Sequence, residues 1–343
     1  MRILVVSDAW HPQVNGVVRT MEQVVRHLSA AGDEVRVIGP ADFRSVPTPG
    51  YREIRLAVLP GRRLRALVDG FVPEAVHIAT EGPLGWAMRR LCRQRGWGFT
   101  SSFHTRFPDY MHARTRAPLA WSWAVMRRFH AASGAVLAAT GSLERELEGR
   151  GFRRVRRWSR GVELERFRPG AAEGMDDPFA GLARPVFLCA GRVAVEKNIG
   201  AFLSLDLPGT KVGVGDGPQL PALRRRHPDA VFLGFRENGA LAACYAAADV
   251  FVFPSRTDTF GLVLLEALAS GTPVAAFPVS GPLDVIGDAP VGALDEDLRA
   301  ACLAALSADA AACRRHAEGF SWAACAARFR EALVPLMAAE RIS

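Results

Sequence analysis

The chain alternates short, largely apolar runs with longer stretches of helical periodicity, and this alternation limits its fold more than any other feature. Runs that are apolar rather than alternating are typical of strands covered on both faces. Strands joined by helices favour parallel, doubly wound sheets of the α/β class. The ten runs that we interpret as strands are Ile3–Ser7, Val35–Gly39, Ala75–Ala79, Phe99–Phe103, Ala135–Ala139, Val186–Ala190, Lys211–Val214, Ala230–Leu233, Val250–Pro254 and Val274–Phe277.

The series of strands restarts at Val186, beyond a stretch rich in Gly, Pro and acidic residues, PGAAEGMDDPFAGLARP. A chain of 343 residues is long for one domain and sufficient for two. We therefore predict Rossmann-like domains at 1–168 and 184–320 that face a cleft, with the boundary at 168–184. A helix within 321–343 is expected to pack back towards the first domain. Sheets of this kind bind ligands at the carboxyl ends of their strands.

Charge is unevenly distributed along the chain. Residues 1–170 hold 28 Arg and Lys against 15 Asp and Glu, whereas the remainder holds 15 against 20. A basic first half indicates an anionic partner, such as a membrane face, a nucleic acid or an anionic substrate. No nucleic-acid motif accompanies the charge, so nucleic acid is not expected as a partner.

Apolar runs, the N-terminal sequence and the cysteines indicate the cellular compartment of the protein. No apolar run reaches ~18 residues without a charge or a proline, so no membrane-spanning helix is expected. The N-terminus MRILVVSDAWHP is typical of a strand rather than of a secretory signal. The six cysteines form no CxxC pair and lie mostly in apolar segments. We interpret them as reduced core residues of a cytoplasmic protein.

The first stretch that indicates chemistry is SDAWHPQVNGVVRT, residues 7–20. A strand ends here, a loop with Asn15 and Gly16 follows, and a helix is expected from about Val17. A glycine allows backbone N–H groups to approach a ligand, and a helix N-terminus favours phosphate. The dinucleotide pattern GxGxxG is absent. The alternative is an ordinary turn between a strand and a helix.

The second stretch is CAGRVAVEKNIGAFL, residues 189–203, in which Arg192 and Lys197 follow a strand that ends at Gly191. Arginine offers a planar fork and lysine a point charge, and a diphosphate can bind both. Lys197 is one of only two lysines in the chain, which favours a specific role. The alternative is a pair of solvated surface cations.

The third stretch is SRTDTFGLVLLEALASGTPVA, residues 255–275, where we expect a helix from near Thr259 to about Ser270. An ionised carboxylate among its apolar residues costs several kcal/mol unless it is paired. Glu266 therefore either has a cationic partner or faces a cleft. If Asp258 also lies on the helix, the two carboxylates are ~12 Å apart and cannot share a metal ion. They suit the two ends of an elongated polar ligand.

Weaker signals lie elsewhere. Gly215 and Gly217 in VGVGDGP follow another strand, and His104 in SSFHTRF follows a strand of the first domain. Each can reach the cleft, although an ordinary structural role is the alternative. Asp176 and Asp177 look like part of a linker, so no metal site is expected there.

Together these stretches resemble retaining glycosyltransferases of the GT-B fold, glycosyltransferase family 4, over nearly the whole chain. The resemblance implies that Asp258 contacts hydroxyls of the donor sugar, Glu266 the ribose, and the backbone of Thr259, Phe260, Gly261 and Leu262 the phosphates. Arg192 and Lys197 would neutralise the leaving diphosphate. Asn15, Gly16, Gly191, Gly215 and Gly217 would line the donor site, and His104 matches a histidine near the donor sugar. The family pair usually begins with Glu, so Asp258 is a departure that bears on the choice of sugar.

The stretches VNGVVRT, HIATEGPLG and FHTRFPDY are most similar to the subgroup that glycosylates lipids, either glycerolipids or mannosyl lipids. Two Arg-rich stretches agree, because basic amphipathic helices can lie on an anionic membrane, each Arg contributing ~1 kcal/mol. The alternatives are a solvated loop for the first and a buried helix for the second. The residues expected at the membrane are Arg62, Arg63, Arg65, Trp121, Trp123, Arg127 and Arg128.

The resulting hypothesis is transfer of a hexose from a nucleotide sugar to a lipid such as diacylglycerol, with the anomeric configuration retained and without a metal or other cofactor. UDP-glucose, UDP-glucuronate, UDP-galactose and GDP-mannose are all open as donors. The enzyme would be cytoplasmic and peripheral on the inner face of the membrane. The alternatives are a soluble or polysaccharide acceptor, a nucleotide-sugar epimerase, and a non-catalytic membrane-associated protein that binds nucleotide sugars.

Overall fold

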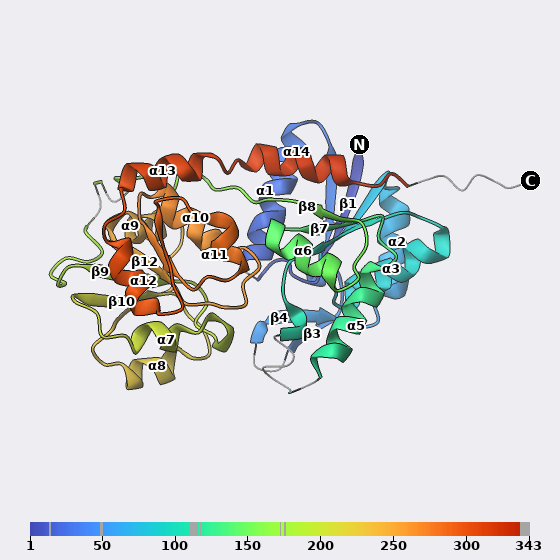
Figure 1. Cartoon of the computed structure of the whole chain (residues 1–343). Helices are drawn as coiled ribbons and strands as arrows, with labels where there is room; N and C mark the ends of the chain where they lie inside the picture. Colours follow the sequence, from blue (N-terminus) through green and yellow to red (C-terminus); the bar gives the residue numbers. More distant parts are fainter. Residues whose placement is uncertain are drawn as a thin grey trace, which may run out of the picture. The chain divides into compact units, whose positions relative to one another are not determined.

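Two six-stranded sheets organise the chain (Figure 1). This computed structural model describes residues 1–13, 15–48, 51–109, 116, 118–171, 173–174 and 176–336. The chain divides into unit 1, Met1–Arg160 with Trp322–Ser343, and unit 2, Gly161–Ser321. The division falls after Arg160, and the segment 168–184, expected as a linker, is part of unit 2. Residues 172, 175 and 337–343 of the expected linker and C-terminal segment lie outside the described residues.

Every strand pair in the sheet of unit 1 is parallel, as the apolar runs predict. The order is β2-β1-β5-β6-β7-β8. The strands are β1 Arg2–Val6, β2 Glu34–Ile38, β5 Ala75–Ile78, β6 Thr100–Phe103, β7 Ala135–Ala138 and β8 Val155–Arg157. The helices are α1 Gly16–Ala30, α2 Gly61–Phe71, α3 Pro83–Arg95, α5 Leu119–His130, α6 Gly141–Gly149 and α14 Trp322–Ala332. A 3₁₀ turn, Pro40–Asp42, and an antiparallel hairpin of β3 Ser45–Thr48 and β4 Tyr51–Ala57 complete unit 1.

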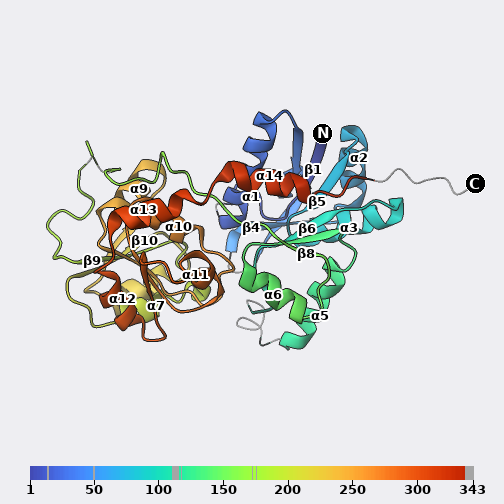
Figure 2. The same ribbon diagram turned by 45° about the horizontal axis from the view of Figure 1, so that its top comes forward.

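Both faces of the unit 1 sheet are covered. Val76 and Ile78 of β5 join the core beneath α2 and α3. The intervening residue, His77, lies against Phe329 of α14, with ring centroids 4.7 Å apart. Helix α14, coloured red, lies alongside α1 although it comes from the far end of the chain (Figures 1 and 2). The C-terminal helix is therefore part of the core of unit 1.

The sheet of unit 2 repeats the same plan, again with parallel pairs throughout. Its order is β11-β10-β9-β12-β13-β14. The strands are β9 Val186–Ala190, β10 Thr210–Val214, β11 Val231–Gly234, β12 Val250–Phe253, β13 Val274–Ala276 and β14 Gly292–Leu294. The helices are α7 Ile199–Leu203, α8 Leu220–Arg226, α9 Asn238–Ala247, α10 Leu262–Ala269, α11 Ser280–Val285, α12 Leu298–Ala305 and α13 Ala310–Glu318, with a 3₁₀ turn at Val195–Lys197.

The prediction of two doubly wound parallel sheets is confirmed, and all ten predicted strands are present. All six cysteines are buried thiols, as expected. In each unit, the carboxyl ends of the strands lie at one edge of the sheet, which we call the ligand edge because open α/β sheets bind ligands there.

Candidate active site

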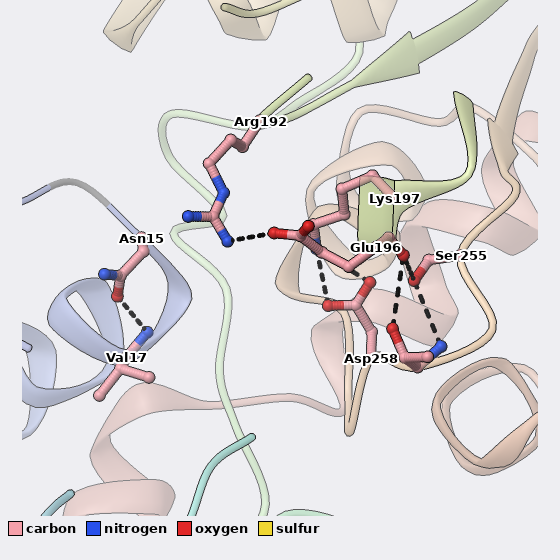
Figure 3. A network of polar contacts seen from close by, with 8 residues as sticks. Asn15, Val17, Arg192, Glu196, Lys197, Ser255 and Asp258 are labelled. Atoms are coloured by element: carbon pink, nitrogen blue, oxygen red, sulfur yellow. Dashed lines mark hydrogen bonds and ion pairs between the residues drawn. The ribbon is translucent and has the colours of Figure 1, made fainter. Parts of the chain in front are cut away.

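Two cations follow β9 at the ligand edge of unit 2, and both already contact a carboxylate (Figure 3). Arg192 Nη2 lies 2.6 Å from Glu196 Oε1. Lys197 Nζ lies 2.7 Å and 2.9 Å from the two carboxylate oxygens of Asp258. Lys197 and Asp258 follow neighbouring strands, β9 and β12, so two of the predicted site residues meet directly. Both side chains keep part of their surface in solvent, 27% for Lys197 and 17% for Asp258.

Backbone contacts hold these two loops together. The carbonyl oxygen of Glu196 accepts hydrogen bonds from Ser255 Oγ at 3.3 Å and Thr257 Oγ1 at 3.4 Å. Asn198 Nδ2 donates to the carbonyl oxygen of Pro254 at 3.1 Å. The loop that carries the cations is therefore fixed to the loop that carries Asp258, and their charges are arranged before any ligand arrives.

Helix α10 begins later than the sequence predicted. It starts at Leu262 rather than near Thr259, because Gly261 adopts a φ of +84°, which is outside the helical region. Asp258 therefore lies in the preceding loop, and the ~12 Å spacing that assumes one continuous helix does not apply. No side chain caps the N-terminus of α10. The amide of Leu264 donates to the carbonyl oxygen of Gly261 at 3.0 Å. A helix N-terminus without a side-chain cap is a favourable place for an anion.

Glu266 has a protein partner that the sequence did not indicate. It is 6% exposed, and its Oε2 accepts a hydrogen bond of 3.0 Å from the hydroxyl of Tyr245 on α9. The sequence left a cationic partner or a cleft open for Glu266. The partner found is a neutral hydroxyl, and contact of Glu266 with a ribose stays a prediction. Tyr245 is itself fully buried, and its carbonyl oxygen accepts a bond from Thr272 Oγ1. No pattern marked this tyrosine, because it lies in an alanine-rich helix like any core residue.

The glycines that follow β9 and β10 allow two loops to lie against each other. A Cβ on Gly215 would lie 1.9 Å from the carbonyl oxygen of Gly191, and one on Gly217 would lie 2.4 Å from that of Val193. Val193 N in turn donates to the carbonyl oxygen of Asp216 at 2.8 Å. Close packing is thus sufficient to explain Gly215 and Gly217, whereas a side chain on Gly191 would enter open space.

At the ligand edge of unit 1, protein side chains cap two helices. Asn15 Oδ1 accepts from the amides of Val17 and Val18 at 3.0 Å each and so caps α1, whose first residue is Gly16 (Figure 3). Asp8 accepts from the amides of Leu84 and Gly85 at the start of α3. The α3 terminus is therefore filled by a protein carboxylate.

Two carboxyl groups of this edge were missed by the sequence interpretation. Burial raises the pKa of Asp8 despite its hydrogen bonds. Glu81, which follows β5, lies 3.1 Å from Nε2 of His130, and the other ring nitrogen of His130 contacts Ser101 Oγ at 2.8 Å. Neither carboxylate has a distinctive spacing in the sequence, and only the strand order brings them together.

His104 follows β6, next to β5 in the sheet. Its Nδ1 lies 3.2 Å from Nη2 of Arg160, and its ring stands edge-on to Trp158 with centroids 5.7 Å apart. Burial, and then the charge of Arg160, hold the pKa of His104 well below its usual range. His104 is therefore a neutral imidazole near pH 7. Arg160 was not singled out from the sequence because it ends the Arg-rich run RRVRRWSR.

Most of the residues expected at a membrane are on the surface of unit 1, with one correction. Arg62, Arg63 and Arg65 of α2 are exposed, as are Arg127 and Arg128 of α5. Trp121 is 62% exposed, but Trp123 is only 4% exposed. Trp123 stacks on Phe103 with ring centroids 5.8 Å apart, so it is a core residue and cannot touch a membrane from this position.

In the part of the chain that the structure describes, no helix is long and apolar enough to cross a bilayer. Among the same residues, no three His, Cys, Asp or Glu side chains are grouped closely enough to hold a metal ion.

Both halves of the chain match models of known protein families. Residues 14–166 match the model of Glycosyltransferase Family 4, and residues 184–309 match that of Glycosyl transferases group 1. The GDP-mannose-dependent alpha-mannosyltransferase of Mycobacterium tuberculosis is 34% identical over 310 residues, covering 83% of this chain and 81% of that protein. The alpha-monoglucosyldiacylglycerol synthase of Streptococcus pneumoniae is 27% identical over 354 residues, covering 90% and 79%.

Among solved structures, the sucrose-phosphate synthase of Thermosynechococcus elongatus has the same fold. The two superpose with a TM-score of 0.75 over 96% of this chain and 97% of that one, at 22% identity. Fold, sequence and the order of the two family models therefore agree. The chain belongs to glycosyltransferase family 4 and is a nucleotide-sugar glycosyltransferase with the GT-B fold.

Proposed function

We propose that this enzyme transfers mannose from GDP-mannose to a hydroxyl group of a membrane lipid, with retention of the anomeric configuration and without a metal ion. The donor is supported by the 34% identity to a GDP-mannose-dependent enzyme. The lipid acceptor is supported by the similarity to a diacylglycerol glycolipid synthase. The UDP-sugars that the sequence left open are the competing donors.

The observation that carries the proposal is the set of charges at the ligand edge of unit 2. Arg192, Lys197 and the uncapped start of α10 supply positive potential where a diphosphate departs. Asp258, held by both of its oxygens, is positioned for the hydroxyls of the donor sugar. In this proposal two side-chain cations and a helix dipole do what a divalent metal does in other transferases.

Retention is supported by the name of the related enzyme, which is an alpha-mannosyltransferase. Mannose is α-linked in GDP-mannose, so an α-mannoside product keeps the configuration. The acceptor oxygen bonds to the anomeric carbon on the face that the diphosphate leaves, and the acceptor proton passes to the departing phosphate oxygen. Glu266 would bind the ribose with its orientation set by Tyr245. Asn15, Gly16 and His104 keep the donor-side roles that the family resemblance implies.

The acceptor side of the proposal rests on the surface of unit 1. Arg62 and Arg63 are exposed in the first turn of α2, three and four positions after Leu59, which is 91% exposed. An exposed leucine beside two arginines suits the boundary between head groups and acyl chains of an anionic bilayer. This would place the protein on the cytoplasmic face of the membrane.

The first experiment measures nucleotide release in EDTA from GDP-mannose and the three UDP-sugars, with and without diacylglycerol in anionic liposomes. We expect release from GDP-mannose that depends on the lipid and yields a mannolipid. Nucleotide release at the same rate with and without lipid would contradict the lipid acceptor. Formation of an epimerised sugar nucleotide without sugar transfer would indicate an epimerase. Loss of activity in EDTA that added Mg²⁺ or Mn²⁺ restores would contradict the metal-independent mechanism.

Variants then test the cations. Arg192→Ala should slow transfer by about a hundredfold, the scale of one key electrostatic contact in the transition state. Arg225→Ala removes an exposed arginine of α8 in the same unit and should leave the rate unchanged. Equal transfer rates in the two variants would show that Arg192 has no catalytic role.

Membrane binding is tested separately by liposome flotation. Arg62→Ala/Arg63→Ala should weaken binding to anionic liposomes about tenfold or more, at ~1 kcal/mol per Arg. Arg153→Ala/Arg156→Ala removes the same charge from exposed positions around β8 and should have a smaller effect. Similar losses in the two variants would mean that only net charge matters and would exclude a specific surface on α2.

A further inference from the structure

Arg160 is a buried cation of unit 1 that the proposed mechanism does not yet use. It is 4% exposed, and no carboxylate among the described residues lies within ion-pair distance of its guanidinium. Its Nη1 donates to the carbonyl oxygens of Trp158 at 2.7 Å and Ser159 at 3.2 Å. The guanidinium carbon lies 4.1 Å from the centre of the Trp158 ring. A buried charge of this kind is costly, so its retention needs a reason.

The remaining polar contact of Arg160 supplies that reason. Nη2 lies 3.2 Å from Nδ1 of His104. A guanidinium group only donates hydrogen bonds, so Nδ1 of His104 must present its lone pair. Because the pKa of His104 is held well below its usual range, the ring carries a single proton. That proton then lies on Nε2.

We propose that Arg160 is a positioning residue that fixes His104 as the Nε2–H tautomer, so that His104 donates a hydrogen bond to a substrate hydroxyl oxygen and never acts as a base. This inference rests on the proposed glycosyl transfer. It deepens that proposal, because a histidine at the ligand edge would otherwise be the obvious group to take the acceptor proton. A ring nitrogen that already accepts from Arg160 cannot take that proton, which agrees with its transfer to the departing phosphate.

The surroundings of Arg160 favour this specific role over simple packing. The planar guanidinium serves two carbonyl oxygens, the face of Trp158 and one imidazole nitrogen at the same time. A lysine ammonium could not reach all four groups. Trp158 also packs edge-on against His104. The contact with Arg160 thus fixes the tautomer of the imidazole, and Trp158 fixes its orientation.

The direct test is ¹⁵N NMR of the full-length protein labelled at histidine, with the signals of His104 assigned from the spectrum of His104→Gln. The expected result is a protonated Nε2 and an unprotonated Nδ1, unchanged between pH 5.5 and 8. In Arg160→Met, which keeps length but cannot donate, the two tautomers should exchange or the preference should reverse. A protonated Nδ1 in the wild-type protein, or an unchanged tautomer in Arg160→Met, would overturn the proposal. This readout needs no transfer activity, so it fails or succeeds independently of the proposed function.

Kinetics supply a second readout if Arg160→Met does not fold. The amide nitrogen of His104→Gln lies near the position of Nε2, whereas that of His104→Asn lies near Nδ1. His104→Gln should therefore keep about tenfold more activity than His104→Asn, the scale of one neutral hydrogen bond. Equal activity, or an Asn variant better than the Gln variant, would contradict donation from Nε2. Where Arg160→Met folds, adding it to His104→Asn should cause little further loss in kcat.

Discussion

The charged side chains at the ligand edge of unit 2 already have protein partners, either an opposite charge or a hydrogen-bond donor. Lys197 contacts both oxygens of Asp258, Arg192 contacts Glu196, and Glu266 accepts from Tyr245. Buried or partly buried charged groups of this kind are costly unless they are paired or hydrogen-bonded. The pairing also limits the rotamers of each side chain, so a ligand meets groups that are already oriented.

Tyr245 gives the first prediction at this scale. Tyr245→Phe removes only the hydroxyl that donates to Glu266, and the ring contact with Phe251, with centroids 5.4 Å apart, should persist. We expect kcat/KM for the donor to fall about tenfold. Without the hydroxyl, the Glu266 carboxylate is no longer fixed in orientation, and the loss corresponds to about one hydrogen bond. Binding of free GDP by calorimetry should weaken in parallel. A variant with unchanged donor affinity would show that Tyr245 serves only the core.

Asp258 gives the second prediction. Asp258→Glu restores the residue more usual in the family, but it moves the carboxylate by one methylene against a lysine that now contacts both of its oxygens. Transfer from the native donor should fall at least tenfold, as small misplacements of catalytic groups do. Glu296→Asp changes length by one methylene at an exposed pair with Arg256 and should leave the rate unchanged. An active Asp258→Glu enzyme with a new donor preference would instead make this position the selector of the sugar.

Helices and strands are held by contacts that the chain makes over long distances in sequence. Helix α14 is joined to unit 1 by Arg330, whose Nε lies 2.7 Å from Oδ2 of Asp33, just before β2. The N-terminal amine contacts the other oxygen at 3.1 Å. The hydrogen bond from Arg330 is the main reason that the pKa of Asp33 lies below its ordinary value of 3.8.

This pair predicts how the stability of unit 1 depends on pH. A carboxyl group whose pKa is lower in the folded state contributes stability that is complete above its unfolded pKa. The contribution is lost as the pH falls through the folded value. Urea unfolding between pH 6 and pH 2.5 should therefore show a decline below about pH 4 that is smaller in Asp33→Asn. Parallel declines in both proteins would assign the effect to other carboxylates.

The strands were the most predictable elements, for a physical reason. The strands β7, β9 and β12 are buried at every position and are apolar throughout. The strands that were missed lack that pattern. Only Val155 of β8 is buried, β14 has three half-buried residues, and β3 pairs with β4 in a separate antiparallel hairpin.

The site was predictable only in part. Lys197 was conspicuous because lysine is rare in this chain, and Asp258 because it closely precedes an apolar segment. The side chains that orient other site residues could not be predicted from the sequence. Tyr245 lies 21 positions from Glu266, and Arg160 lies 56 positions from His104. Tertiary packing alone brings these pairs together, and neither partner differs in sequence from an ordinary core tyrosine or one more arginine in a basic run.

At the scale of the whole molecule, the chain leaves unit 1 after Arg160 and returns to it at Trp322. Unit 2 is therefore one continuous segment with its own sheet and core. Unit 1 instead depends on the end of the chain. Phe329 of α14 is fully buried against His77 and Trp158, and Trp158 Nε1 donates to the carbonyl oxygen of Cys325 at 3.1 Å.

A chain that ends at Ser321 should therefore lose the stability of unit 1 and keep that of unit 2. Loss of Phe329 alone should cost unit 1 about 3–5 kcal/mol, the scale of removing a buried Phe. Calorimetry should show a lowered or absent transition for unit 1, while GDP binding to the Arg192 and Lys197 edge persists. A chain that ends at Leu336 keeps α14 and its bond from Leu336 N to Glu74 O, so it should melt like the full protein. If GDP binding disappeared with α14, a folded unit 1 would be required for nucleotide binding, and Arg192 and Lys197 of unit 2 would not be sufficient for it.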